Sequence, residues 1–395
     1  MKLRSVDEFS PFLYPSRTVE LKTPRGSILT PLRAATSYEY KSKMKTPTAA
    51  PIDSPVLINI KKLPPRDLQS FITKNESFGE LLRKIGMANR AGQYANIRLA
   101  LLQPTRTTYE KDGISSMSIL QGSTSARERF LRFVVKIQQE AGMDIVTVPF
   151  IQLPYATLKK TVTDMHRVLT RLGVEPLFFV DLQYNQFESL IHLLVDELES
   201  KLVGLIHRRY ADQPIHYDYL RSYYDRNIAF LSVETSRFDE NLDDISTMHY
   251  LPFLGNDVYA VRVPLPFHNE LEIQKPAKQD EPRLEKIRFF DRQTLKVKPA
   301  GLFDTERVLS DIQYQDQDII RRMLDNRAEV NGDNSKYQVL NSFSKVHELN
   351  TSLLEFGDFR ERIRKNETKD YIDEKEALKP LLAQARKKST LDKYS

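Results

Sequence analysis

The sequence predicts an α/β fold and, within that class, a (β/α)8 TIM-type barrel followed by a mainly helical C-terminal extension. Three observations lead to this prediction. Eight short, nearly continuous apolar runs lie in the first two thirds of the 395 residues, as is typical of strands buried on both faces of a parallel sheet. Helical patterns separate most of these runs. After about residue 264 the pattern becomes Pro-rich, then charged and helical.

The predicted strands are rich in β-branched and aliphatic residues. They cover residues 27–34, 56–60, 97–103, 144–150, 177–182, 202–207, 228–233 and 258–263. Pro31 weakens the first of them as a central strand, because proline cannot donate a ladder hydrogen bond. A doubly wound open sheet is the alternative layout, since the same periodicity fits both arrangements.

The predicted helices carry apolar residues at a spacing of three and four, which gives each a single buried face. Gly173 ends one of them, and Asn185 can cap the start of the next. They cover residues 66–90, 125–141, 155–172, 186–200, 217–224 and 242–254.

The C-terminal third has a different pattern. Residues 264–282 are Pro-rich and charged, which indicates a loop or boundary. Residues 286–290 and 294–297 are a candidate hairpin, and the chain beyond residue 305 reads as charged helices interrupted at 331–334. We therefore predict three units, which are an N-terminal arm (1–18), the barrel (19–265) and the extension (266–395).

Composition excludes several kinds of site. The chain has no Cys, which rules out disulfides, thiolate zinc sites, iron–sulfur clusters and a cysteine nucleophile. It has only 13 Gly and no Gly-rich phosphate loop. The seven His are scattered without a metal-binding spacing. We predict no cofactor and no metal.

Charge is spread unevenly along the chain. Residues 1–130 hold 21 Lys and Arg against 11 Asp and Glu, whereas the whole chain carries +6. Such a surplus suits a phosphate-bearing partner such as tRNA or DNA, although a solvated basic face is the alternative. No apolar run is long enough to span a membrane, and the N-terminus has no signal-peptide pattern, so we expect a cytoplasmic protein without a membrane partner.

In a barrel of this kind, the active site lies at the C-terminal ends of the strands. Asp181 and Glu234 are the carboxylates nearest to such ends, and they are the candidate catalytic residues. Asp181 would attack as nucleophile or base, and Glu234 would act as a second acid. The alternative for Asp181 is a buried ion pair with no catalytic role.

Ligand-binding candidates follow the same rule. Guanidinium and imidazole groups after the strands could hold phosphate, and an amide could bind a polar ligand. The alternative for the cluster after the sixth strand is a solvated loop. The candidates are Gln183, His207, Arg208, Arg209, Arg237 and Arg262.

Four segments carry a family resemblance. Residues 19–31 (VELKTPRGSILTP) resemble the opening of tRNA-guanine transglycosylases, the queuine and archaeosine tRNA-ribosyltransferases, where a short strand leads to G-x-x-x-T-P. Residues 141–146 (AGMDIV) are similar to that family's G-x-D-I segment, and residues 176–183 (PLFFVDLQ) occupy the place of its next strand. Residues 257–262 (DVYAVR) are similar to its late strand, which begins with the nucleophilic Asp.

The resemblance implies a barrel over residues 19–265, with Asp257 as a nucleophile. The chain departs from the family elsewhere. Residues 103–109 (QPTRTTY) replace its D-S-G-G-F-Q stretch, and residues 207–210 (HRRY) replace its Gly-rich loop. The three zinc-binding cysteines are absent. The predicted strand boundaries also put Asp257 before the last strand, at the opposite end from Asp181 and Glu234.

Three functions remain open at this point. The first is a zinc-free, divergent transglycosylase-like barrel that binds nucleic acid or a nucleotide-like ligand, with base exchange or other glycosidic chemistry if it is an enzyme. The second is a non-catalytic barrel in a larger complex, assembled as a homo-oligomer or with a protein partner through the C-terminal helices. The third is an enzyme acting on a small phosphorylated or acidic metabolite.

Overall fold

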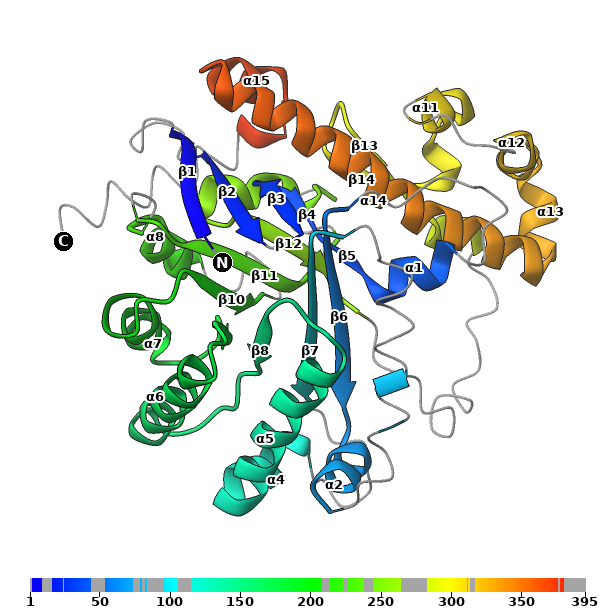
Figure 1. Cartoon of the computed structure of the whole chain (residues 1–395). Helices are drawn as coiled ribbons and strands as arrows, with labels where there is room; N and C mark the ends of the chain where they lie inside the picture. Colours follow the sequence, from blue (N-terminus) through cyan, green and yellow to red (C-terminus); the bar gives the residue numbers. More distant parts are fainter. Residues whose placement is uncertain are drawn as a thin grey trace.

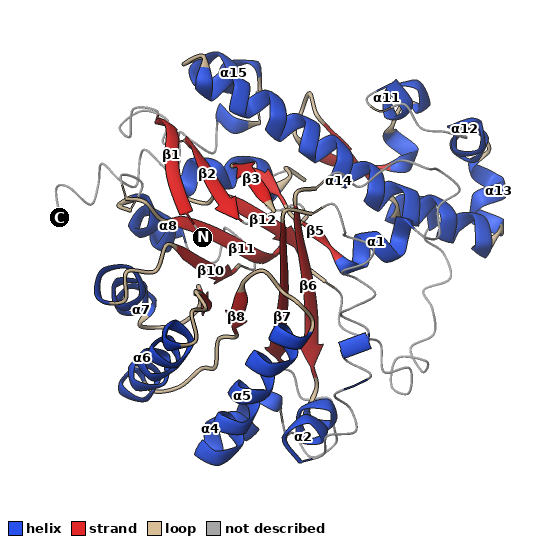
Figure 2. Ribbon diagram, viewed as in Figure 1, coloured by secondary structure: helices blue, strands red, loops and turns tan. Residues whose placement is uncertain are grey.

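The structure is a computed structural model, and it shows an α/β protein with its strands in the centre and helices around them (Figures 1 and 2). It describes residues 2–8, 16–23, 25–43, 54–73, 79, 82–83, 95–105, 115–207, 214–223, 226–237, 244–263, 283–310, 312, 317–375 and 377–379. The predicted α/β class is confirmed.

The largest sheet has six strands, all parallel, in the order β4-β12-β11-β10-β9-β8. Nearly all of their residues are buried, which explains why the strands appear in the sequence as continuous apolar runs. The strands are β4 (Leu32–Arg33), β8 (Val146–Val148), β9 (Pro176–Asp181), β10 (Leu202–Ile206), β11 (Ala229–Thr235) and β12 (Val258–Val261).

A second parallel sheet contains β5 (Ala35–Thr36), β6 (Val56–Leu63) and β7 (Ile97–Pro104), in that order. A single residue, Ala34, separates β4 from β5, so one short stretch of chain pairs with β12 on one side and with β6 on the other. The amide of Ala34 itself donates to the Tyr259 carbonyl (2.7 Å).

The far strand of the second sheet, β7, lies beside the far strand of the first, β8. The amide of Asp144 donates to the Arg98 carbonyl (3.1 Å). The hydroxyl of Thr147 donates to the Ala100 carbonyl (2.7 Å). Successive strands of the two sheets are therefore neighbours in space as well as in sequence.

Helices connect these strands on the outside (Figure 1). In α5 the predicted apolar stripe is buried, including Phe130, Val134 and Ile137. The helices are α1 (Ser37–Lys43), α2 (Pro65–Thr73), α4 (Ser116–Gly122), α5 (Thr124–Glu140), α6 (Tyr155–Arg171), α7 (Phe187–His192) with a π-helical continuation (Leu193–Glu197), α8 (Pro214–Arg221), and α9 (Thr247–Tyr250) with a 3-10 turn (Leu251–Leu254).

The predicted first strand, 27–34, is divided in the structure. Its first half is β3 (Gly26–Leu29), which pairs antiparallel with β2 (Arg17–Thr23), and β2 pairs with β1 (Lys2–Glu8). The chain then turns at Thr30 and Pro31 before β4 begins. Pro31 has no amide hydrogen for a ladder, so one continuous strand was the wrong prediction here.

The C-terminal region combines a hairpin with helices, as the sequence indicated. The hairpin is β13 (Arg288–Asp291) and β14 (Lys296–Pro299). The short helices are α11 (Thr305–Ser310), α12 (Gln317–Asp325), α13 (Arg327–Gly332) and α15 (Thr368–Glu374). The long helix α14 (Asn334–Arg364) begins at Asp333, whose carboxylate accepts from the amides of Ser335 and Lys336.

Helix α14 contributes to three hydrophobic cores, and in the smallest of them its Val346 and Leu349 pack with residues of the second sheet such as Leu57. Its first half contributes Leu340 and Phe343 to a small core under α11–α13. Its second half contributes Phe356 and Phe359 to the main core under the six-stranded sheet. In Figure 1 this helix (orange) runs from the C-terminal helices across the ends of the blue N-terminal strands. It therefore ties the C-terminal region to the strands.

Candidate functional site

Five polar side chains lie at the C-terminal ends of the parallel strands, and we call them the rim. They come from β6, β7, β9, β11 and the residue after β12, and they are Lys62, Gln103, Asp181, Glu234 and Arg262.

An ion pair joins two strands of the rim that are not neighbours. The Lys62 ammonium lies 2.7 Å from Oε2 of Glu234, and the side chains are only 10% and 12% exposed. β6 and β11 belong to different sheets. The Arg262 guanidinium lies 3.9 Å from the same oxygen and is 66% exposed. One carboxylate thus faces a cation that is largely shielded from solvent and a second cation that is mostly exposed.

Strand alternation accounts for the position of Lys62. Val56, Ile58 and Ile60 are buried, and Lys62 continues their face of β6. The register pairs Lys62 with Gln103 in β7, so the two side chains are cross-strand neighbours. Oε1 of Gln103 is buried and has no hydrogen-bond partner within the described residues.

Glu234 has an unusual backbone. Its φ is 62°, in the left-handed region that non-glycine residues rarely adopt. The pairing of β11 with β12 shifts between Ser232 and Thr235, so Glu234 occupies a bulge. Its Oε1 is buried and, among the described residues, accepts no hydrogen bond. A strained residue with an unsatisfied charged oxygen is a candidate for ligand contact.

Asp181 lies at the same end of the sheet. Its carboxylate is buried and accepts from the backbone amide of Gln183 (2.8 Å). Asp181 pairs in register with Ile206 of β10, which pairs with Val233 of β11. One strand therefore separates Asp181 from Glu234, and their backbones lie about 10 Å apart. Gln183 lies two residues after Asp181 and is half-buried.

His207 also follows a strand of this sheet, but its ring is fully buried. Its amide donates to the Val233 carbonyl (2.9 Å). Burial lowers the pKa of His207 to about 3, so the ring is uncharged at neutral pH. The other two predicted phosphate contacts of this loop, Arg208 and Arg209, lie outside the described residues.

Asp257 lies at the opposite ends of the strands. Its carboxylate accepts from Arg17 (3.0 and 3.3 Å) and from the Phe230 amide (2.9 Å). Arg17 also donates to the Ile228 carbonyl. The structure therefore does not bring Asp257 together with Asp181 and Glu234, and both of its oxygens are already engaged.

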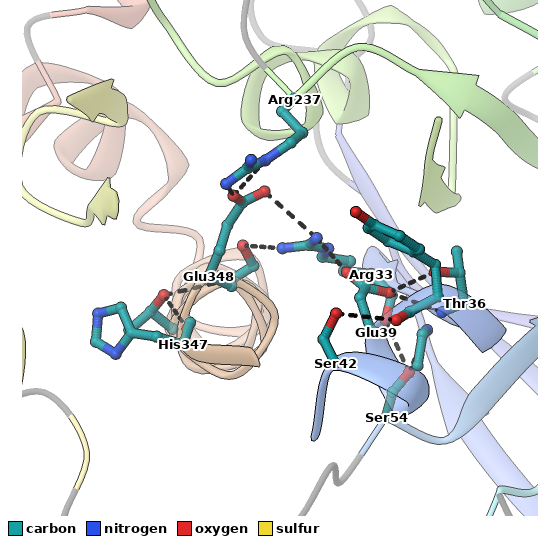
Figure 3. A network of polar contacts seen from close by, with 12 residues as sticks. Arg33, Thr36, Glu39, Ser42, Ser54, Arg237, His347 and Glu348 are labelled. Carbon is teal, nitrogen blue, oxygen red and sulfur yellow. Dashed lines mark hydrogen bonds and ion pairs between the residues drawn. The ribbon is translucent and has the colours of Figure 1, made fainter. Parts of the chain in front are cut away.

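Arg237 does not belong to the rim, because its side chain is part of an ionic network with Glu348, Arg33 and Glu39 (Figure 3). Its Nε donates to Oε2 of Glu348 on α14 (2.6 Å). The Arg33 guanidinium lies 3.3 Å from the other Glu348 oxygen and also binds Glu39 of α1. Burial raises the pKa of Glu39, against the opposing effect of Arg33. Burial alone would raise the pKa of Glu348, but Arg237 and Arg33 outweigh it and lower that pKa.

A pocket of about 430 Å³ opens at the same end of the sheet, after β8 and β9. Its walls are fixed by hydrogen bonds from Gln121 to the Gln152 carbonyl (2.8 Å) and from the Tyr184 hydroxyl to the Leu153 carbonyl (3.0 Å). The lining has no charged side chain and consists of Gln121, Gln152, Leu153, Pro154, Tyr155, Tyr184, Asn185 and Gln186. Amides and phenols suit an uncharged ligand group with donors and acceptors.

Sequence reasoning overlooked Lys62, Gln103 and the amide pocket. The predicted second strand stopped at Ile60, two residues before Lys62. Every second residue from Val56 to Ile60 is apolar, and Lys62 is the next position on that face of the strand. This spacing is the signal that could have identified Lys62. Among the described residues, no group of His, Asp and Glu is placed to hold a metal ion. No helix in that part of the chain is long and apolar enough to cross a membrane.

Comparison with known proteins adds no family. No family model matches the sequence, and no curated protein matches it. The resemblance to tRNA-guanine transglycosylases therefore stays a prediction.

Proposed function

We propose that the chain is a closed eight-stranded α/β barrel that binds a nucleotide-like ligand at its rim. The strand order supports closure, because it follows the chain without the reversal of a doubly wound sheet. β4 pairs with β12, and β7 lies beside β8. The ion pair between Lys62 and Glu234 fits this proposal, since β6 and β11 would face each other across the interior of a cylinder.

The observation that carries the ligand proposal is the incomplete hydrogen bonding of the Glu234 carboxylate. Lys62 holds one of its oxygens, while the other is buried without a donor among the described residues. A ligand N–H or O–H at this oxygen would satisfy it and recover the free energy lost by burying it unpaired. The edge of a nucleobase and a sugar hydroxyl both offer such a donor.

The rest of the rim suits the other parts of a nucleotide. Lys62 and Arg262 together exceed the single charge of Glu234, and the exposed Arg262 is open to a phosphate group. The amide pocket after β8 and β9 suits an uncharged ring, because amides pair with base edges through a donor and an acceptor.

Base exchange is the chemistry that we propose for this site. Asp181 would attack the sugar carbon, forming a C–O bond as the C–N bond breaks and the electron pair leaves with the base, which takes a proton from solvent. An incoming base then reverses the step and loses its N–H proton. Glu234, which is paired with the Lys62 ammonium, would accept that proton as the general base of this step.

Binding is tested by fluorescence anisotropy with a tRNA transcript and with duplex DNA over a salt series. We expect the affinity to fall steeply with salt, and Arg262→Gln to reduce the logarithmic slope by about one. Arg132→Gln, on the exposed face of α5, is the control and should leave the slope unchanged. An affinity that ignores salt would remove the phosphate contact.

Catalysis is tested with radiolabelled guanine and unlabelled tRNA. We expect the wild type to incorporate label and Asp181→Asn to lose incorporation while still binding tRNA. Binding without any incorporation by the wild type would contradict base exchange and favour the non-catalytic barrel.

A further inference from the structure

The Glu234 turn needs support from its surroundings. A non-glycine residue with φ of 62° is strained, and such strain persists only where neighbouring contacts hold it. The bulge also removes regular pairing with β12 between Ser232 and Thr235. Lys62 holds the Glu234 side chain, and the Arg262 amide donates to the Thr235 carbonyl (2.9 Å) directly after the turn. The segment that follows Thr235 is a further source of support.

Arg237, three residues after Glu234, supplies an anchor. Its guanidinium donates to Glu348 of α14 through Nε (2.6 Å) and through a second nitrogen, and that second nitrogen also donates to the Arg288 carbonyl of β13 (3.4 Å). The segment leaving the rim is thus attached at one point to both a helix and a hairpin from the C-terminal third of the chain.

Glu348 is itself held on its other side. The Arg33 guanidinium lies 3.3 Å from Glu348 and donates to the Ser352 hydroxyl (3.2 Å), and it also binds Glu39. Figure 3 shows Arg237 and Arg33 reaching Glu348 from different parts of the chain. Arg33, Glu39 and Glu348 are each about 1% exposed.

Stability alone is a weak reason for this arrangement. The three buried charges of Arg33, Glu39 and Glu348 are costly to desolvate, and apolar side chains of similar volume often replace such groups without loss. Directional ion pairs do, however, fix the relative positions of the elements that carry them.

We propose that Arg237, Glu348 and Arg33 form a brace through which helix α14 positions the Glu234 turn of the rim. The three are positioning residues, and none of them contacts the ligand. The importance of the turn rests on the proposed function, whereas its attachment to α14 does not.

Hydrogen exchange measured by mass spectrometry on the full-length protein tests the brace without a ligand. Glu348→Gln should speed amide exchange in residues 229–237 by about tenfold or more, because it weakens the contact with Arg237. Arg237→Lys is the second variant, since its partly exposed side chain tolerates change, and it should act on the same segment.

Glu355→Gln is the matched control. Glu355 is equally buried on the same helix and pairs with Arg292 (3.1 Å) and Lys375 (2.7 Å) instead of Arg237. It should leave exchange in 229–237 unchanged relative to the rest of the sheet. Equal local exchange in Glu348→Gln, Arg237→Lys and the wild type would overturn the brace.

Binding of the tRNA transcript completes the test. If the wild type binds, Glu348→Gln and Arg237→Lys should weaken binding by about tenfold while Glu355→Gln does not. Unchanged binding in the first two would overturn the positioning role. If the wild type does not bind, faster exchange confined to 229–237 still supports the attachment, and only the proposed function fails.

Discussion

Asp257 and Glu234 are carboxylates at opposite ends of the strands of one sheet, and they differ in how many of their oxygens have a donor. Asp257 accepts from Arg17 and from a backbone amide, so both of its oxygens have donors. Glu234 has one oxygen on Lys62 and leaves the other without a donor among the described residues. We infer that Asp257 stabilises the fold, whereas Glu234 is kept ready for a ligand.

The stabilising role of Asp257 gives a direct prediction. Asp257→Asn should lower the free energy of unfolding by about 3 kcal/mol, because it leaves the buried Arg17 without its anionic partner. Asp358→Asn is the control, since Asp358 pairs with Arg292 while 65% exposed, and it should change stability by less than about 1 kcal/mol. Urea unfolding measures both, and equal effects would contradict the assignment.

A second residue-level prediction concerns pH. His347 is fully buried on α14, and burial lowers its pKa to about 3 in the folded protein, below the usual 6.5. The unfolded chain binds this proton below pH 6.5 and the folded protein does not, so stability falls as pH drops from 6.5 toward 3. Between pH 6.5 and 5, the free energy of unfolding of His347→Gln should fall by about 2 kcal/mol less than that of the wild type. Urea unfolding of both proteins at each pH measures this difference. An equal fall in the free energy of unfolding of the two proteins would contradict the prediction.

At the scale of the elements, β10 depends on a glycine for its fit against β9. A Cβ at Gly204 would lie 2.5 Å from the ring of Phe179, its register partner. Gly204 has no positive φ, so close approach, and not backbone freedom, is the reason for glycine. The aromatic ring occupies the space that a side chain would need.

Gly204→Ala should therefore destabilise the protein by about 1–3 kcal/mol through overpacking. Gly122→Ala is the matched control, because a Cβ at the end of α4 meets nothing within 4 Å and should be neutral or slightly stabilising. Thermal unfolding compares the two. A glycine-to-alanine change at 204 that is as mild as at 122 would show that β9 and β10 can separate.

At the scale of the whole molecule, helix α14 covers the strands predicted to form an independent barrel. Phe356 stacks against His249 (4.7 Å) and Tyr259 (5.8 Å), and Phe359 packs on Phe253 (5.1 Å). Glu348 also neutralises the buried Arg33. Removing α14 would expose these rings to solvent. It would also remove one of the two carboxylates that offset the buried positive charge of Arg33.

We expect a fragment of residues 1–265 to lack cooperative folding for this reason. Near-ultraviolet circular dichroism and a thermal scan of the purified fragment would measure it, with the full chain as the reference. A sharp thermal transition with native-like aromatic signals would show instead that the 19–265 unit is self-sufficient.

The sequence was most informative where structure is local and periodic. Buried parallel strands and one-sided helices leave repeating apolar patterns, and most elements were located from them. The rule that sites lie at strand ends selected Asp181, Glu234 and Arg262. It missed Lys62 because the predicted strand ended too early. The partner of Arg237 could not be predicted, because Glu348 lies 111 residues away and nothing local indicates the pairing.

The single residue between β4 and β5 has a consequence for synthesis on the ribosome. Residues 35–36 can pair with β6 soon after they emerge, but residues 32–33 pair with β12, which follows more than 220 residues later. At usual translation rates, that delay is on the order of 10 to 45 s. During this interval the backbone groups of residues 32–33 have no strand to pair with. A chaperone that shields exposed strand edges would therefore be needed most at this stage of synthesis.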